Sequence, residues 1–169
     1  MKHVMSVVWV VLVMLVAPSV ASAQMVILVR HAERADGGAP AANAMMTPAD
    51  PELSATGKAR ALTLAAMLKD AGVTKIVTTQ YKRTIDTAAP LAGVLKISPE
   101  AIESRDQASL VAKIKAHTTG AVLVVGHSNS VPAIIKALGG PDVIIGESEY
   151  DSLFFLAPGG VLTRVRFQP

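Results

Sequence analysis

Cysteine is absent from this 169-residue sequence, and aromatic residues make up only 4% of it. Without cysteine the chain can form no disulfide bond, thiolate nucleophile or cysteine-ligated metal site. Nucleic-acid binding needs aromatic platforms for stacking and a clustered basic stripe, whereas the basic residues here are scattered. We therefore expect no nucleic-acid partner and interpret the net charge of +3 as a contribution to solubility.

The only long apolar run lies at the start of the chain. A short basic start, Met1 to His3, precedes nearly unbroken apolar sequence over residues 4–16, and Ala21-Ser22-Ala23 forms an Ala-x-Ala pattern. These three parts are typical of a cleaved secretory signal peptide. An uncleaved anchor is the alternative, but the run is shorter than the ~20 residues of a spanning helix. We expect residues 1–23 to direct export to the periplasm or beyond, leaving no stable membrane anchor.

Residues 24–169 alternate between two patterns and are enough for a single domain with a buried core. Short runs rich in Val and Ile, typical of strands buried on both faces, occur at 25–29, 75–78 and 121–125. Helical periodicity occurs at 54–70, 81–95, 107–117 and 130–138. The sequence therefore predicts a three-layer α/β/α fold around a mostly parallel sheet.

Two further segments complete the expected domain. Residues 152–156 and 161–167 read as strands joined by a Pro158-Gly159-Gly160 turn, which predicts a hairpin at the C-terminal edge of the sheet. Residues 35–53 are rich in Ala, Gly, Pro and Asp and have neither period, so we expect a long loop, either functional or a surface excursion.

Two arginines and two histidines follow the expected parallel strands. Arg30 and His31 end the first, Arg83 comes shortly after the second, and His127 follows the third. Because ligands bind at the carboxyl ends of such strands, we expect these side chains to gather at one edge. Guanidinium groups crowded beside imidazoles match a tetrahedral oxyanion, and the helix start expected near Arg83 also favours an anion. The sequence predicts a phosphate pocket.

These segments are similar to motifs of the histidine phosphatase superfamily, which includes the phosphoglycerate mutase type. The resemblance covers nearly all of residues 24–169. Ala32 stands where the family usually has Gly, which is tolerated if the backbone there does not need positive φ. The segments that carry the resemblance are Val29-Arg30-His31-Ala32-Glu33, Leu53-Ser54-Ala55-Thr56-Gly57, Thr78-Thr79-Gln80-Tyr81-Lys82-Arg83-Thr84-Ile85-Asp86-Thr87-Ala88 and Val125-Gly126-His127-Ser128-Asn129.

The resemblance implies a phosphatase in which His31 attacks phosphorus and becomes phosphohistidine, which water then hydrolyses. It also implies that Arg30, Arg83 and His127 hold the phosphoryl oxygens, and that neither a metal nor another cofactor is required. An imidazole of reference pKa ~6.5 is largely neutral near pH 7, as a nucleophile must be. For the proton donor the resemblance favours Glu103. The rival carboxyl groups are those of Asp106, Glu33, Glu149 and Asp151.

Other functions fit less well. Gly126-His127-Ser128-Asn129-Ser130 is similar to a nucleophile elbow, but no histidine follows it to serve a catalytic serine. A metal site on His31 and His127 is disfavoured by the adjacent arginines, and a mutase by the short domain. The alternative that stays open is an exported phosphate- or phosphoester-binding protein without turnover. We expect a phosphatase acting on a phosphorylated small molecule or phosphoprotein, with its oligomeric state open.

Overall fold

The computed structural model describes residues 24–37 and 50–169, so the expected signal peptide lies outside the described residues. Six strands form one sheet in the order β3-β2-β4-β1-β5-β6. The strands are β1 (Val26–Arg30), β2 (Val73–Thr79), β3 (Glu100–Ile102), β4 (Ala121–Gly126), β5 (Ser152–Leu156) and β6 (Leu162–Arg166). The helices are α1 (Ala55–Leu68), α2 (Lys82–Leu95), α3 (Gln107–Ala116) and α4 (Ser130–Ala137). No helix within this described part is long and apolar enough to cross a membrane.

The sheet is mostly parallel, as predicted. Strands β1, β4, β2 and β3 pair in parallel, whereas β5 pairs antiparallel with β1 and β6 antiparallel with β5. The expected hairpin is therefore β5–β6, joined by the short 3₁₀ turn η1 (Pro158–Gly160), and it forms one edge of the sheet. Strand β3 was not predicted, because three residues are too few to show a period.

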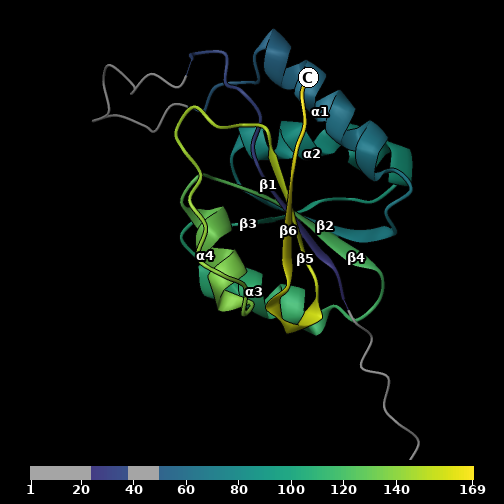
Figure 1. The fold of residues 1–169 in the computed structure, drawn as a ribbon. Helices are drawn as coiled ribbons and strands as arrows, with labels where there is room; N and C mark the ends of the chain where they lie inside the picture. The colour runs from purple at the N-terminus through teal and green to yellow at the C-terminus, as the bar shows by residue number, and fades with distance from the viewer. Residues whose placement is uncertain (1–23, 38–49) are drawn as a thin grey trace, which may run out of the picture.

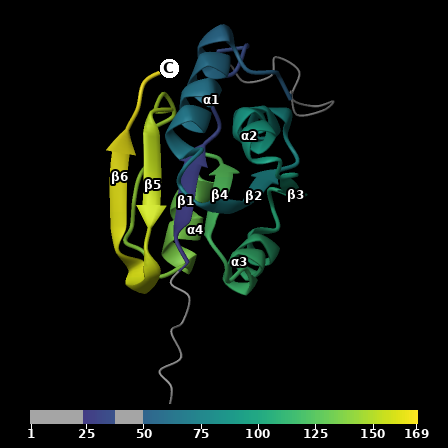
Figure 2. The same ribbon diagram turned by 90° about the vertical axis from the view of Figure 1, so that its right-hand side faces the viewer.

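Helices cover both faces of the sheet (Figure 1), and the side view separates α1 and α2 from α3 and α4 (Figure 2). Side chains alternate along β1 accordingly: Ile27 and Val29 pack in the cluster that includes α1 and α2, and Val26 and Leu28 in the one that includes α3 and α4. Burial on both faces explains why the strand sequences are continuously apolar. The three-layer prediction is confirmed.

The start of α1 lies against the segment that follows β1. The Ser54 side chain caps the helix by accepting from the Gly57 backbone N–H at 3.0 Å. Gly57 faces the backbone of Glu33 so closely that an added Cβ would lie 2.3 Å from its carbonyl oxygen. Arg34 and Leu53 form an isolated bridge that brings the two ends of the expected long loop together, and the middle of that loop, 38–49, lies outside the described residues.

Strand register brings the three polar strand ends level with one another. Arg30 is paired with Gly126 in the β1–β4 ladder, and Thr78 with Val125 in the β2–β4 ladder. The residues after these pairs, His31 and His127 among them, therefore emerge at one edge of the sheet.

Candidate active site

His31 is buried, with 4% of its surface exposed, and its backbone is held by a 2.9 Å bond from its N–H to the Gly126 carbonyl. Its ring nitrogen Nδ1 lies 2.8 Å from the carbonyl oxygen of Ala32. A carbonyl oxygen only accepts, so Nδ1 carries the proton and donates it. Nε2 of the neutral ring therefore has the free lone pair, which is the nucleophilic atom of an imidazole.

The backbone after His31 tolerates alanine. The φ angle of Ala32 is not positive, since Lys96 is the one non-glycine residue with positive φ in the described part of the chain. The Ala32 N–H donates to Thr87 Oγ1 at 2.9 Å, and that hydroxyl donates to the Arg83 carbonyl at 2.6 Å. Thr87 thereby ties the segment that follows β1 to α2, and the expectation that alanine would be accepted here is confirmed.

Burial dominates the titration of His31, lowering its pKa to about 3. The positive charges of Arg83 and Arg30 and the neighbouring His127 lower it further, while the hydrogen bond to Ala32 acts in the opposite direction. His31 is consequently neutral throughout the physiological range, the form required for attack on phosphorus.

His127 lies beside His31, as the sequence predicts. The two ring centroids are 5.3 Å apart in an edge-to-face arrangement, and the Tyr81 ring flanks His127 at 5.6 Å. Nε2 of His127 lies 3.0 Å from Thr79 Oγ1 at the end of β2. Burial, followed by the charges of Arg83 and Arg30, lowers the pKa of His127 to about 4. Both histidines of the site are thus held neutral by burial and by the cations around them.

Arg83 occupies the first turn of α2, where the sequence predicts an anion. The carboxylate of Asp50 lies there: its oxygens accept from the Lys82 N–H at 2.9 and 3.0 Å, and one lies 3.5 Å from Arg83 Nη1. The guanidinium also stacks on the Tyr81 ring at 4.1 Å. Burial and then the nearby charge of Arg34 lower the pKa of Arg83, whereas the Asp50 carboxylate acts in the opposite direction.

Arg30 also binds the loop that precedes β5. Its Nη1 donates to the carbonyls of Gly146, Glu147 and Glu149 at 2.7–3.1 Å, which fixes the loop before β5 against the site. Its Nη2 contacts the Tyr150 hydroxyl and a Glu147 carboxylate oxygen, each at 3.5 Å. Arg30 therefore holds the loop mainly through Nη1, while its Nε makes no hydrogen bond to any described residue.

The unpaired Nε donors of the two site arginines suit an anion. The Nε atoms of Arg30 and Arg83 are buried without a hydrogen-bond partner among the described residues. Arg60 shows the geometry that a guanidinium group adopts with an oxyanion, since its Nε and Nη2 donate to the Glu33 carboxylate at 2.7–3.0 Å. Unpaired buried donors cost free energy, and a phosphoryl group would supply the missing acceptors.

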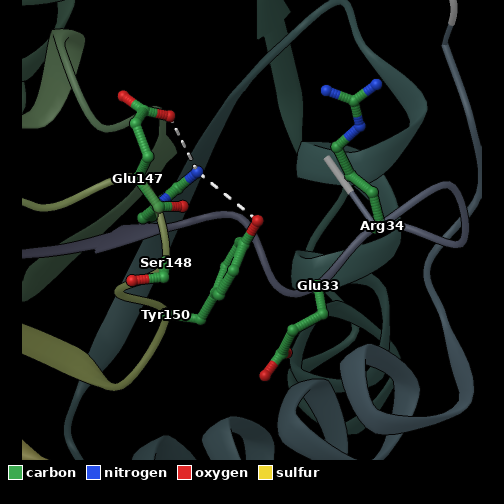
Figure 3. Close-up of a pocket in the computed structure, with 7 residues that line it drawn as sticks. Glu33, Arg34, Glu147, Ser148 and Tyr150 are labelled. Atoms are coloured by element: carbon green, nitrogen blue, oxygen red, sulfur yellow. Dashed lines mark hydrogen bonds and ion pairs between the residues drawn. The ribbon is translucent and has the colours of Figure 1, made fainter. Parts of the chain in front are cut away.

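A pocket of about 510 Å³ opens beside Arg30 and Tyr150. In Figure 3, Glu147 and Arg34 lie on opposite sides of Tyr150, and Ser148 lies below Glu147. The Tyr150 ring lies 6.0 Å from that of His31, so the pocket adjoins His31. Its lining residues are Arg30, Glu33, Arg34, Gly37, Glu147, Ser148 and Tyr150.

The structure does not bring Glu103 into contact with the histidines. It is exposed and follows β3, which is separated from β1 by β2 and β4, although it emerges at the same edge of the sheet. The rival carboxyl groups have other partners. Glu33 accepts from Arg60, Asp106 from the Ser109 N–H, Glu149 from Ser152 and Arg164, and Asp151 from Arg166. Glu103 as proton donor stays a prediction.

Three residues at this edge have roles that the sequence did not assign to them individually. Asp50 lies in a segment without periodicity, Tyr150 precedes a strand 120 residues after Arg30, and Thr79 reads as a strand residue. Within residues 24–37 and 50–169, no group of three or more His, Asp or Glu side chains is arranged so that it could hold a metal ion.

Comparisons with known proteins agree with this geometry. A family model for the histidine phosphatase superfamily (branch 1) matches residues 26–107, which contain His31 and Arg83, whereas His127 lies beyond the match. No curated protein matches the chain significantly by sequence.

Solved structures of low identity share the fold. The protein histidine phosphatase SixA complexed with tungstate is 19% identical, with 83% of this chain and 94% of that chain covered and a TM-score of 0.62. The mycobacterial glucosyl-3-phosphoglycerate phosphatase is 16% identical, with 86% and 99% covered and a TM-score of 0.61. A phosphoserine phosphatase from Entamoeba histolytica is 15% identical, with 86% and 97% covered and a TM-score of 0.60. On the family match, residues 26–107 of this chain belong to the histidine phosphatase superfamily.

Proposed function

We propose that this protein is a phosphatase that forms a phosphohistidine intermediate on His31. The observation that carries the proposal is the hydrogen bond from His31 Nδ1 to the Ala32 carbonyl at 2.8 Å, which leaves the Nε2 lone pair available. Family membership and phosphatases of the same fold support it.

The reaction needs two displacements at phosphorus. In the first, the Nε2 lone pair forms a P–N bond while the P–O ester bond breaks, and the leaving oxygen takes a proton. In the second, water attacks phosphorus and gives a proton to the group that donated the first one, the P–N bond breaks, and phosphate leaves as His31 recovers its lone pair. Arg30 and Arg83, with their unpartnered Nε atoms, stabilise the negative charge on the transferring group throughout. Glu103 is our candidate donor for the first proton.

The preferred substrate is a small phosphorylated molecule with a polar remainder. The pocket beside Arg30 has the size of a small-ligand site and is lined by charged and hydroxyl side chains. Arg34 on one side and Glu147 on the other offer both a hydrogen-bond donor and an acceptor. Relatives of this fold include phosphatases named for a sugar phosphoglycerate, phosphoserine and protein phosphohistidine. A panel of these classes, assayed against Arg34→Gln and Glu147→Gln variants, tests whether this pocket selects among them through KM.

A phosphate-binding protein without turnover is the second candidate, and the exposed position of Glu103 favours it. Release of nitrophenol from a nitrophenyl phosphate between acidic and neutral pH separates the two. We expect turnover by the wild type and loss of at least about a thousandfold in His31→Ala, because removing a nucleophile removes the chemical path. Release no faster than that of His31→Ala would support the binding protein.

We also propose that the protein works outside the cytoplasm. The support is the basic start, apolar run and Ala-x-Ala pattern of residues 1–23. The expected result is a mature N-terminus at Gln24 in the exported fraction. A full-length chain retained with the cytoplasm would contradict this proposal.

A further inference from the structure

We propose that Thr79 is a positioning residue: it fixes the tautomer of His127 through a chain of hydroxyl groups, so that Nδ1 is the ring nitrogen that meets the phosphoryl group. The role of the phosphoryl group rests on the proposed function, but the tautomer of His127 can be tested without turnover.

The chain of hydrogen bonds runs from His127, just after β4, to Thr79 at the end of β2 and on to Thr84 at the start of α2. His127 Nε2 lies 3.0 Å from Thr79 Oγ1, which lies 2.9 Å from Thr84 Oγ1. Thr84 Oγ1 in turn lies 2.8 Å from the Tyr81 carbonyl oxygen and 3.0 Å from that of Thr79. Thr79 is 2% exposed and Thr84 is fully buried, so water does not compete for these bonds.

The two carbonyl oxygens set the direction of every proton in the chain. A hydroxyl group has one proton, and the Thr84 oxygen faces two groups that can only accept. If its proton pointed elsewhere, oxygen lone pairs would face each other at hydrogen-bond distance. Thr84 therefore donates to the carbonyls and accepts from Thr79, and Thr79 accepts from His127. Nε2 of His127 must carry a proton.

The free nitrogen of His127 is consequently Nδ1. No residue in the described part of the chain bonds to it, and the neutral ring presents a lone pair there. The charged and titratable groups around the ring are Arg30 at the end of β1, His31 just after it, Arg83 and Tyr81 at the start of α2, and Asp50. Glu147 reaches the same corner through its bond to Ser128 at 3.0 Å.

A bound phosphoryl dianion would change the state of this nitrogen. The lone pair of Nδ1 repels phosphoryl oxygens, whereas a protonated Nδ1 donates to them, so the anion should draw a proton onto Nδ1. Thr79 keeps Nδ1 directed at the phosphoryl group, because it accepts the hydrogen bond from the Nε2 proton. Without this bond, His127 could change tautomer, and either the lone pair or the proton could face the phosphoryl group. His31 and His127 thus use opposite tautomers, fixed respectively by a carbonyl and by a hydroxyl chain.

The sequence offers a matched control one residue away. Thr78 is on the same strand and is fully buried, but its hydroxyl has no hydrogen-bond partner among the described residues. Thr78→Val and Thr79→Val therefore remove the same atoms from adjacent buried positions, and only the second breaks the chain to His127. Thr79→Ser restores the hydroxyl.

Long-range proton–nitrogen NMR of histidine-labelled, unliganded protein at pH 7 tests the tautomers directly. The expected result is an Nε2–H tautomer for His127 and an Nδ1–H tautomer for His31 in the wild type and Thr78→Val. Thr79→Val should show mixed tautomers at His127 only, and Thr79→Ser should restore the wild-type signal. An Nδ1–H tautomer for His127 in the wild type, or an unchanged tautomer in Thr79→Val, would overturn the proposal.

Binding and kinetics extend the test to the anion. Calorimetry with inorganic phosphate, in buffers of different ionisation enthalpy, should show proton uptake that Thr79→Val reduces and Thr78→Val keeps. The value of kcat/KM should fall by about tenfold in Thr79→Val, in line with loss of one hydrogen bond at a reacting group. Equal behaviour of the two valine variants would contradict the role of Thr79. Correct tautomers in a protein without turnover would contradict only the proposed phosphatase function.

Discussion

The neutral histidine pair should make the protein lose stability as the solution becomes moderately acidic. The unfolded chain has ordinary histidines of pKa about 6.5, whereas the folded pKa values are about 3 for His31 and about 4 for His127. Below pH 6.5 the unfolded state binds protons that the folded state does not. Stability therefore declines from about pH 6.5 down to about pH 4 for His127 and about pH 3 for His31.

The size of the loss follows from the same values. Between pH 7 and pH 5 each histidine contributes about 2 kcal/mol of destabilisation, so the pair contributes roughly 4 kcal/mol. That is a large part of the ~5–15 kcal/mol that stabilises an ordinary domain. The carboxyl groups with lowered pKa values, such as Glu100 and Glu149, contribute mainly at lower pH. The histidine contribution should thus stand apart in this window.

Urea unfolding followed by circular dichroism at pH 7 and pH 5 measures this loss. The control is a His31→Gln/His127→Gln double variant, which keeps every other titrating group and should lose at most a small fraction of the wild-type amount. Parallel declines in the two proteins would refute the reasoning, since the loss would then come from groups outside the site.

Three further outcomes test the packing that holds the site. Gly57→Ala should destabilise the protein by about 2 kcal/mol or more, because the new Cβ would overlap the Glu33 carbonyl oxygen. Gly93→Ala in α2, where an added Cβ would meet nothing within 4 Å, should instead stabilise the protein by roughly 0.5–1 kcal/mol. Thermal unfolding compares the two variants, and stability changes of the same sign would be evidence against the contact between Gly57 and Glu33. Arg60→Met should cost about 3 kcal/mol in urea unfolding, because it strands the Glu33 carboxylate and frees the C-terminal segment bound through Phe167, and a loss below 1 kcal/mol would argue against this bridge. Lys58→Met removes the exposed ion pair between Lys58 of α1 and Glu52, and it should leave stability unchanged within error.

The sequence was sufficient to predict the core of the site because its signals were local. Continuous apolar runs ending in Arg30-His31 and in Gly126-His127 specify buried parallel strands, and parallel strands end at a common edge. The position of Arg83 in the first turn of a helix follows from the period of the residues after it. These predictions need no knowledge of contacts between distant residues.

The contacts that refine the site join residues with no local signal. The carboxylate at the start of α2 comes from Asp50, 32 residues before the Lys82 N–H that it binds. The loop that Arg30 holds lies more than 100 residues away and has no regular pattern. The choice of general acid also depends on contacts that have no local signal. Glu103 differs from its rivals in its exposure and in the hydrogen-bond partners of the other carboxylates, and residue type does not distinguish them.

The proposed reaction depends on one covalent bond, between phosphorus and Nε2 of His31. Rapid quenching under non-acidic conditions during turnover of a labelled phosphomonoester, followed by peptide mass spectrometry, locates the phosphoryl group. We expect an acid-labile label on His31 that is absent from His31→Ala. A label on a serine or aspartate, or turnover that continues at the wild-type rate in His31→Ala, would contradict it.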